Sequence, residues 1–254
     1  MGETKKCEIR FSFTEKIKAY FKGAEVTSNG GLLAVRELDE QMGLTGLAEE
    51  YLTDKRQRRN IQHEITELLR QSVYSRLAGY KDTNDAQTLR QDPALKVILG
   101  ERAMGKGGSS ENTIGRFEKE ILTEQDNLVE MDELLMKWIE KADTARGVKE
   151  IVLDIDSSES PVYGNQEGGV YNGYFGLKLF VMAYNMGNFL RTLVLPKSIK
   201  HWSLRTIQLK MIKVGARMIK HARYYCLLLA ETSISEKIFL CLMRNIRQLG
   251  FALG

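Results

Sequence analysis

The sequence changes character at Gly147, and this change constrains the fold more than any other feature. Before it, apolar residues recur at helical spacing; Ile65, Leu68 and Leu69, for example, share one stripe of a helix predicted over residues 60–78. After it comes Glu150–Ser158, in which four apolar residues are interleaved with two aspartates, as in a buried strand that ends in carboxylates. The part before Gly147 is therefore predicted to be almost wholly helical.

Capping and breaking residues give the predicted elements. Short extended segments are expected at 9–21 and 24–27, and helices at 32–42, 44–52, 60–78, 83–89, 93–99, 110–118 and 124–142. A glycine-rich segment at 105–109 lacks the ending of a phosphate-binding loop and is interpreted as a flexible connection. Beyond the strand at 151–156, the pattern predicts a second strand at 168–176, helices at 177–195, 203–214 and 235–246, and a hairpin of 217–221 with 224–230.

Asp154 and Asp156 lie on one face of the predicted strand, because side chains alternate in direction along a strand. Two such carboxylates repel each other unless a cation lies between them, and oxygen ligands suit Mg²⁺ or Mn²⁺. A pair of these ions can hold the attacking and leaving oxygens of a phosphodiester exchange. The alternative is a strand that ends in polar residues at the surface, with Asp156 capping the turn at Ser157.

A metal site of this type normally needs further acidic ligands from elsewhere in the fold. No aspartate follows Asp156, and the later glutamates are Glu159, Glu167, Glu231 and Glu236. The sequence therefore shows the beginning of an active site without its completion.

Charge is distributed unevenly along the chain. Residues 177–254 contain 13 Lys and Arg against 2 Glu, a net charge of +11, whereas residues 1–176 carry 24 bases and 31 acids, a net charge of −7. Such a basic segment indicates a surface that binds nucleic acid, and the alternative is a solvated face that balances the acidic part of the same chain. The candidate DNA-binding residues in it are Lys200, Arg205, Lys210, Lys213, Arg217 and Lys220. Arg56, Arg58 and Arg59 are weaker candidates, since a solvated loop explains them more simply.

Several other classes of function are disfavoured. The three cysteines show no metal-ligand spacing, and their odd number argues against a disulfide framework. Neither Ser157 nor Ser158 has the Gly-x-Ser-x-Gly setting of a serine hydrolase. No uncharged apolar stretch reaches the roughly 18 residues that a membrane helix needs, and the polar N-terminus is unlike a signal peptide. A cytoplasmic protein is expected.

A series of motifs, in order along the chain, resembles one family of bacterial enzymes. The motifs are Val26–Leu33 with Arg36–Asp39; Glu67–Gln71; Ala78–Ala86; Leu89–Pro93; the set Ser110, Thr113, Arg116, Phe117 and Glu118; Leu153–Asp156 with Pro161–Gly164; Ala183–Arg191; Lys200–Leu204; and Ile212–Ala216. With them the chain resembles the transposases of the thirteen-eighty family of insertion sequences, over nearly its whole length. The resemblance implies a DDE enzyme with a ribonuclease-H-like core. Its intact relatives are expected to cut and join DNA with Mg²⁺ or Mn²⁺.

The middle of the chain departs from the family pattern. Family members have further core strands, a second catalytic aspartate and a helix with the catalytic glutamate after the first catalytic strand. Here Tyr171–Gly176 passes almost directly into the late helix at Leu177, which indicates an internal deletion with its junction near Gly176–Lys178. By motif position, Asp156 is the first choice and Asp154 the second for a surviving catalytic and metal-binding residue.

The expected fold is mainly α with a small β component, a helical N-terminal region joined to an incomplete ribonuclease-H-like α/β core. The expected regions are 1–146, helical and of DNA-binding or dimerisation type; 147–176, the remnant of the first catalytic strand and turn; and 177–254, the basic C-terminal segment. The expected function is that of an internally deleted, inactive DDE transposase, with either Mg²⁺ or Mn²⁺ or no ion bound. The alternatives are a DNA-binding remnant that represses transposition and a product without a role. The expected partner is DNA that carries terminal inverted repeats, and a homodimer is possible. No membrane is expected to be involved. The expected location is the bacterial cytoplasm, in association with the nucleoid.

Overall fold

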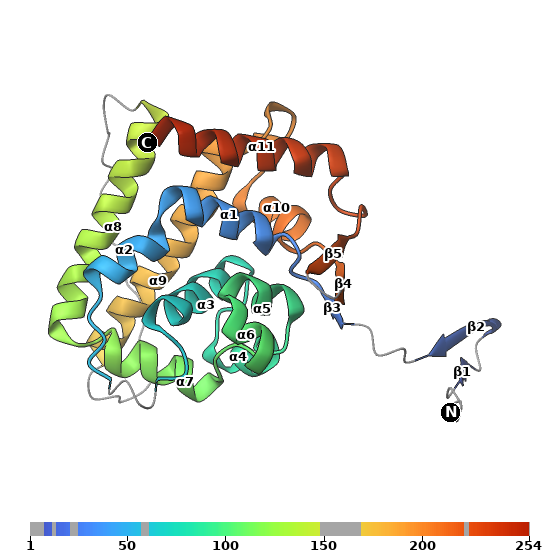
Figure 1. Ribbon diagram of the computed structural model, residues 1–254, viewed down its shortest axis with the longest axis horizontal. Coiled ribbons are helices and arrows are strands. Elements are labelled where there is room, and N and C mark those ends of the chain that lie inside the picture. The colour runs from blue at the N-terminus through green and yellow to red at the C-terminus, as the bar shows by residue number, and fades with distance from the viewer. Residues whose placement is uncertain are drawn as a thin grey trace.

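The computed structural model describes residues 8–11, 14–20, 25–56, 61–147, 169–220 and 224–253, and side chains in all of these except 8–20, 169–175 and 250–253. This part of the chain is mainly helical with a small β component, which confirms the predicted fold class (Figure 1). The helices are α1 Leu32–Met42, α2 Leu44–Tyr51, α3 Ile65–Leu77, α4 Ala86–Leu89, α5 Pro93–Leu99, α6 Glu101–Lys106, α7 Glu111–Arg116, α8 Gln125–Arg146, α9 Gly169–Phe189, α10 Leu204–Ile207 and α11 Glu236–Leu253.

Most helix boundaries follow from the residues that the sequence offers as caps and breakers. The side chain of Asp92 accepts a hydrogen bond from the Leu95 N–H at the start of α5, and that of Ser110 accepts one from the Thr113 N–H at the start of α7. Gly147 ends α8 with a positive φ of 64°, a conformation that glycine adopts without strain. The predicted starts at Pro93 and Ser110 are confirmed, and the helix predicted at 124–142 continues to Arg146, just before Gly147.

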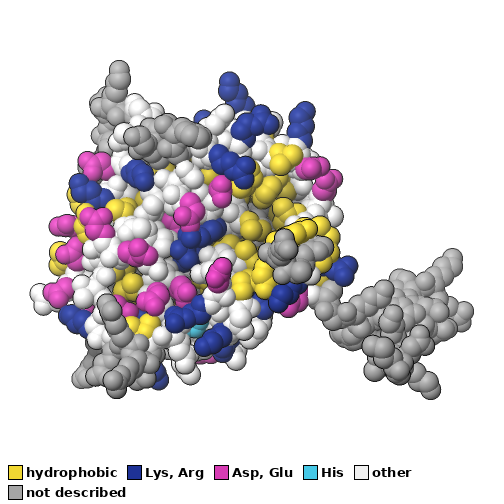
Figure 2. Space-filling model, in the orientation of Figure 1, with side chains coloured by type: hydrophobic (Ala, Val, Ile, Leu, Met, Phe, Trp, Pro, Cys, Tyr) yellow, Lys and Arg dark blue, Asp and Glu magenta, His cyan; other side chains and the backbone are white. Residues whose placement is uncertain are grey.

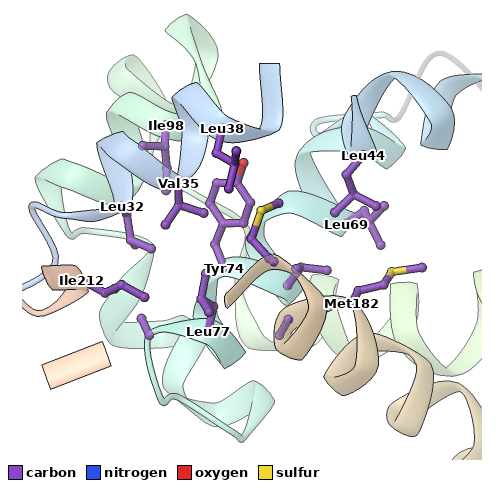
Figure 3. Packing of buried hydrophobic residues seen from close by; sticks show 14 of the residues in the cluster. Leu32, Val35, Leu38, Leu44, Leu69, Tyr74, Leu77, Ile98, Met182 and Ile212 are labelled. Atoms are coloured by element: carbon purple, nitrogen blue, oxygen red, sulfur yellow. The ribbon is translucent and has the colours of Figure 1, made fainter. Parts of the chain in front are cut away.

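One hydrophobic core joins helices from both halves of the sequence. In Figure 3, α1 contributes Leu38, α3 contributes Tyr74, α9 contributes Met182, and the π-helical segment Gln208–Ile212 contributes Ile212. All four are buried, with 0% of their surface exposed. Described residues on both sides of residue 147 therefore share one core. The three predicted regions stay a prediction.

Two small sheets account for the described strands. In the first, β1 Glu8–Phe11 pairs antiparallel with β2 Thr14–Tyr20, so the extended segment predicted at 9–21 is a hairpin of two strands. In the second, β3 Glu25–Thr27 pairs with β4 Ala216–Lys220, which pairs with β5 Tyr225–Leu229, all antiparallel. The predicted C-terminal hairpin is confirmed, and the N-terminal strand β3 extends it into a sheet.

Three local predictions are wrong. The strand predicted at 168–176 is the first part of α9, which continues without a break through the expected junction at Gly176–Lys178. The segment at 105–109 is not a flexible connection, because α6 continues to Lys106 and the Ser109 N–H and C=O both bond to the buried Gln71 amide, at 2.8 and 2.9 Å. Neither Ser28 nor Asn29 caps α1, whose N-cap residue is Gly31.

A buried polar network connects α1 to α3. The Asp39 carboxylate, which is fully buried, accepts hydrogen bonds from the Tyr74 hydroxyl at 2.7 Å and the Thr45 N–H at 3.1 Å. Arg70 lies 3.9 Å from the same carboxylate and donates to the Leu99 carbonyl at 3.3 Å. Burial lowers the pKa of Arg70, and burial together with the Asp39 charge raises the pKa of Tyr74 well above its usual value.

None of the helices in the described part of the chain is long and apolar enough to cross a membrane.

Candidate nucleic-acid interface

The catalytic aspartates predicted from the sequence, Asp154 and Asp156, lie outside the described residues, as does the strand that would carry them. Within the described residues, no group of three or more His, Cys, Asp or Glu side chains could hold a metal ion. Glu231 and Glu236, the two glutamates of the C-terminal segment, are exposed in and after the turn that follows β5. The described residues therefore do not test the predicted metal site, and the candidate DNA-binding residues are the part of the prediction that they can locate.

Two arginines of the N-terminal region are paired with carboxylates. Arg56 is paired with Asp54 through two hydrogen bonds of 2.8 and 2.6 Å, and the bond from Arg56 holds the pKa of Asp54 below its ordinary value. Arg76 makes a similar two-pronged contact to Glu118, at 2.8 and 2.9 Å, and both side chains are 8% exposed. Arg58 and Arg59 lie outside the described residues.

The six C-terminal candidates differ from Arg56 and Arg76 in both exposure and pairing. Lys200, Arg205, Lys210, Arg217 and Lys220 are exposed and Lys213 is half-buried. They lie on consecutive elements, from the turn before α10, through α10 and the π-helical segment Gln208–Ile212, to strand β4. In the described part of the chain, none of the six forms a salt bridge; the C-terminal cations that do are Lys178, with Asp132, and Arg247, with Glu37. The six candidates thus present positive charge that no salt bridge within the described residues neutralises.

Aromatic rings accompany three of these cations. The Lys213 ammonium lies 3.8 Å from the centroid of the Tyr80 ring, and Lys210 lies 5.4 Å from that of Trp202. Burial would raise the pKa of the Tyr80 hydroxyl, but side-chain interactions with Lys213 and Asn29 outweigh it, so that pKa lies below its usual value. Lys220 lies over Tyr225, its cross-strand neighbour, at 5.6 Å. The rings hold the ammonium groups at the surface without neutralising them.

A cleft of about 360 Å³ lies between the end of α3, α9 and α10. Its polar lining includes Lys81 and Arg205, and its apolar lining includes Phe180 and Tyr184. Arg205 donates to the side-chain oxygen of Gln208, whose amide nitrogen donates to the Leu77 carbonyl at 2.9 Å. Exposed rings beside cations are what a nucleic acid uses for base stacking and phosphate contact.

Three residues of this cleft were not predicted from the sequence. Phe180 and Tyr184 belong to the helix predicted at 177–195 and were not among the candidates, yet they are 39% and 56% exposed, whereas Leu179 and Met182 are buried. Spacing alone could have separated them, because Phe180 and Tyr184 are four residues apart on a second stripe of α9. Lys81 lies in the motif Ala78–Ala86 but could not be recognised as a binding candidate, because only the fold brings it next to α10.

The N-terminal motif and the closing motif meet beside this surface. The Gly30 N–H donates to the Val214 carbonyl at 2.8 Å, and the Gly31 N–H donates to the Ile212 carbonyl at 3.1 Å. Asn29 donates to the Asp92 carboxylate at 3.1 Å and accepts from the Tyr80 hydroxyl at 3.3 Å. Gly30, Gly31 and Asn29 therefore hold the segment that carries Lys213 in place.

Comparisons with known proteins place the chain in a family. A family model described as Transposase DDE domain group 1 matches residues 9–181 and, as a second segment, residues 176–251. The two segments overlap at residues 176–181, within α9. No curated protein and no solved structure matches the chain.

Proposed function

Because the chain belongs to the DDE transposase family, we propose that it is an internally deleted member that binds DNA and no longer carries out strand transfer. The observation that carries this proposal is the set of six exposed or half-exposed C-terminal cations without salt bridges in the described residues. Hydrogen bonds between motifs from both ends of the chain hold the segment that carries Lys213 in place. A DNA backbone is the polyanion that such a surface fits.

The deletion is supported by the way in which the family model matches. A chain that had lost its middle would match such a model in two pieces that meet at the junction, and the two segments here meet at residues 176–181. The sequence indicates a junction at Gly176–Lys178, within the same stretch. The finer placement among the thirteen-eighty family of insertion sequences, with its terminal inverted repeats as the bound DNA, rests on the motifs in the sequence.

Within the described residues, no group of His, Cys, Asp or Glu side chains forms a metal site. In the DDE family a divalent metal ion, Mg²⁺ or Mn²⁺, stabilises the charge that develops on the phosphate oxygens. Asp156 and Asp154 would supply two carboxylates. The described glutamates of the C-terminal segment, Glu231 and Glu236, belong to no cluster that could hold a metal ion. No catalytic step is assigned to this chain.

We expect no cleavage of transposon-end DNA by the purified protein in Mg²⁺ or Mn²⁺, because two carboxylates alone cannot hold the attacking and leaving oxygens in position. The assay uses labelled inverted-repeat DNA and compares the wild type with Asp156→Ala. Equal backgrounds for the two proteins are the expected result. Cutting by the wild type that disappears in Asp156→Ala would contradict the proposed loss of catalysis.

DNA binding should be strong at low salt and fall steeply as salt rises. If the six cations each neutralise one phosphate, raising the salt from 50 to 200 mM should weaken binding on the order of 10³-fold. Replacing Lys200 and Arg205 with alanine should lower the salt slope by about two units, since two counterion-releasing contacts are lost. Fluorescence anisotropy on inverted-repeat and random duplexes at several salt concentrations measures both quantities.

The matched control for this experiment removes two cations that are already paired. Lys137 and Arg146 are exposed on α8, where each lies beside a carboxylate, at 3.3 and 3.4 Å. The Lys137→Ala, Arg146→Ala variant has the same net charge as the test variant and should keep the wild-type salt slope. Equal losses in the two variants would mean that only net charge matters, and no binding by the wild type would refute a role in DNA binding.

A role as a repressor of transposition follows if the chain prefers inverted repeats over random DNA, because it would then occupy the sites of an intact transposase. This activity would be exercised in the bacterial cytoplasm, at the nucleoid. Equal affinity for both duplexes would leave general DNA binding as the function.

A further inference from the structure

Strand β5 forms one edge of the three-stranded sheet. The order β3–β4–β5 leaves β5 paired on one side, and no described strand lies beyond it. Its five residues, Tyr225–Leu229, include no charged residue and no proline, the two features with which proteins usually protect an exposed edge. The other edge strand, β3, is three residues long and contains Glu25.

The backbone groups of β5 alternate in direction. The Ala230 N–H donates to the Gly215 carbonyl at 2.7 Å, so the N–H and C=O of Ala230 point toward β4. Because these groups alternate along an antiparallel strand, those of Cys226 and Leu228 also point toward β4, while those of Tyr225, Leu227 and Leu229 point away from it. The outward-pointing residues are symmetric about Leu227.

The surface around this edge is apolar. Leu228 is 50% exposed, Tyr225 is 45% exposed, and Leu240 on α11 is 55% exposed. A cleft between β5 and the start of α11 is lined by Leu227, Leu229, Phe239 and Leu240 among others. Figure 2 shows hydrophobic side chains gathered on the side of the molecule where Figure 1 places this sheet.

We propose that two copies of this chain associate through β5, in an antiparallel pair centred on Leu227 that joins their two sheets. In this register Tyr225 lies opposite the partner's Leu229, and Leu227 lies opposite the partner's Leu227. These are the residues whose backbone groups point outward, so about six hydrogen bonds form across the pair. The interface is self-complementary, as a two-fold dimer requires.

Side chains and charges support a second copy as the occupant. Tyr225 shares its face of the strand with Leu227 and Leu229, so the partner's Tyr225 lies beside Leu229, at the mouth of the apolar cleft. The two ends of the sheet carry opposite charges, with Lys220 at the end of β4 and Glu231 after the end of β5, and an antiparallel pair places each end beside the oppositely charged end of the other copy. DNA is disfavoured at this edge, since β5 has no cation and Glu231 and Glu236 line the cleft.

The first test measures the mass of the full chain by sedimentation velocity, over roughly 1–100 µM. The wild type should show a concentration-dependent dimer. Leu227→Pro removes the central outward N–H while leaving the β4 side of the strand intact, and should weaken the dimer roughly tenfold or more. A monomer at every concentration, or a folded Leu227→Pro variant that dimerises as tightly as the wild type, would overturn the proposal.

A cross-linking experiment tests the register and remains decisive if Leu227→Pro fails to fold. In the proposed pair Leu228 lies opposite the partner's Cys226 as a non-hydrogen-bonded pair, with Cα atoms about 4.5 Å apart, within the range of a disulfide. In a background with Cys7→Ser and Cys241→Ser, Leu228→Cys should give a covalent dimer on mild oxidation. The matched control is Val26→Cys. Val26 on β3 pairs with Arg217 on β4, which in turn pairs with Leu228 on β5, so the new cysteine lies away from the β5 edge and should give no covalent dimer.

Equal cross-linking in the two variants, or none in Leu228→Cys, would refute this pairing. DNA binding is measured on the same samples. A monomeric wild type that still binds DNA would overturn the β5 dimer alone and leave the proposed function standing.

Discussion

Replacing Gly31 with alanine is expected to destabilise the protein by roughly 3 kcal/mol or more. A Cβ at Gly31 would lie 1.7 Å from the Met211 carbonyl oxygen and 2.7 Å from the Ile212 Cα, and both are backbone atoms that cannot turn aside. The start of α1 would have to move away from the closing segment and lose the hydrogen bonds from Gly30 and Gly31. Thermal unfolding should shift down by about 10 °C for a domain of this size.

Gly46→Ala is the matched control. Gly46 lies in the first turn of α2, and an added Cβ meets no heavy atom within 4 Å. Alanine should leave the stability unchanged or raise it by up to about 1 kcal/mol, because it costs less conformational entropy in a helix than glycine does. An unchanged melting temperature for Gly31→Ala would mean that α1 and the closing segment are not in close contact.

Replacing Asp39 with alanine should cost about 3–5 kcal/mol. The buried Tyr74 hydroxyl and the Thr45 N–H would lose their acceptor, and the buried Arg70 would lose a neighbouring carboxylate. Chemical denaturation monitored by circular dichroism gives the free energy of unfolding.

Glu40→Ala provides the comparison for Asp39. Arg36 forms salt bridges with both, at 3.5 Å to Asp39, but the Glu40 side chain is 53% exposed whereas that of Asp39 is buried. It should cost less than about 1 kcal/mol, as surface ion pairs do. Combining Asp39→Ala with Arg70→Met should recover part of the loss, since the buried cation is then removed as well. Equal effects for Asp39→Ala and Glu40→Ala would contradict the structural role of the buried network.

Much of the secondary structure could be predicted, because local chemistry determines it. The pattern gave α1 its bounds of Leu32–Met42, and Pro93 and Gly147 began and ended helices as expected. The clearest failure is at 168–176, where glycines and aromatic residues favour a strand in isolation. These residues form the first turns of the long helix α9, and extending a helix costs less free energy than starting one.

The candidate site was predictable in its charge and not in its shape. The basic C-terminal segment is visible in the sequence, and its six candidate cations lie on consecutive elements of the structure. The sequence could not show that Arg76 pairs with Glu118, 42 residues away, or that Lys213 lies over Tyr80. The cleft with Tyr184 and Arg205 also needs three elements that are distant in the sequence.

By itself, the sequence determined the helices, the charge asymmetry and the family, because periodicity, capping residues and short motifs are local properties of the chain. Only the tertiary structure decided which charges remain unpaired and which motifs meet. Coulomb forces and steric exclusion act between groups that are close in space, and Gly31 acquires its tightest constraint from Met211, far along the chain. That is why the framework of this protein could be predicted from its residues, whereas its candidate binding surface and its exposed β5 edge became visible only in the folded molecule.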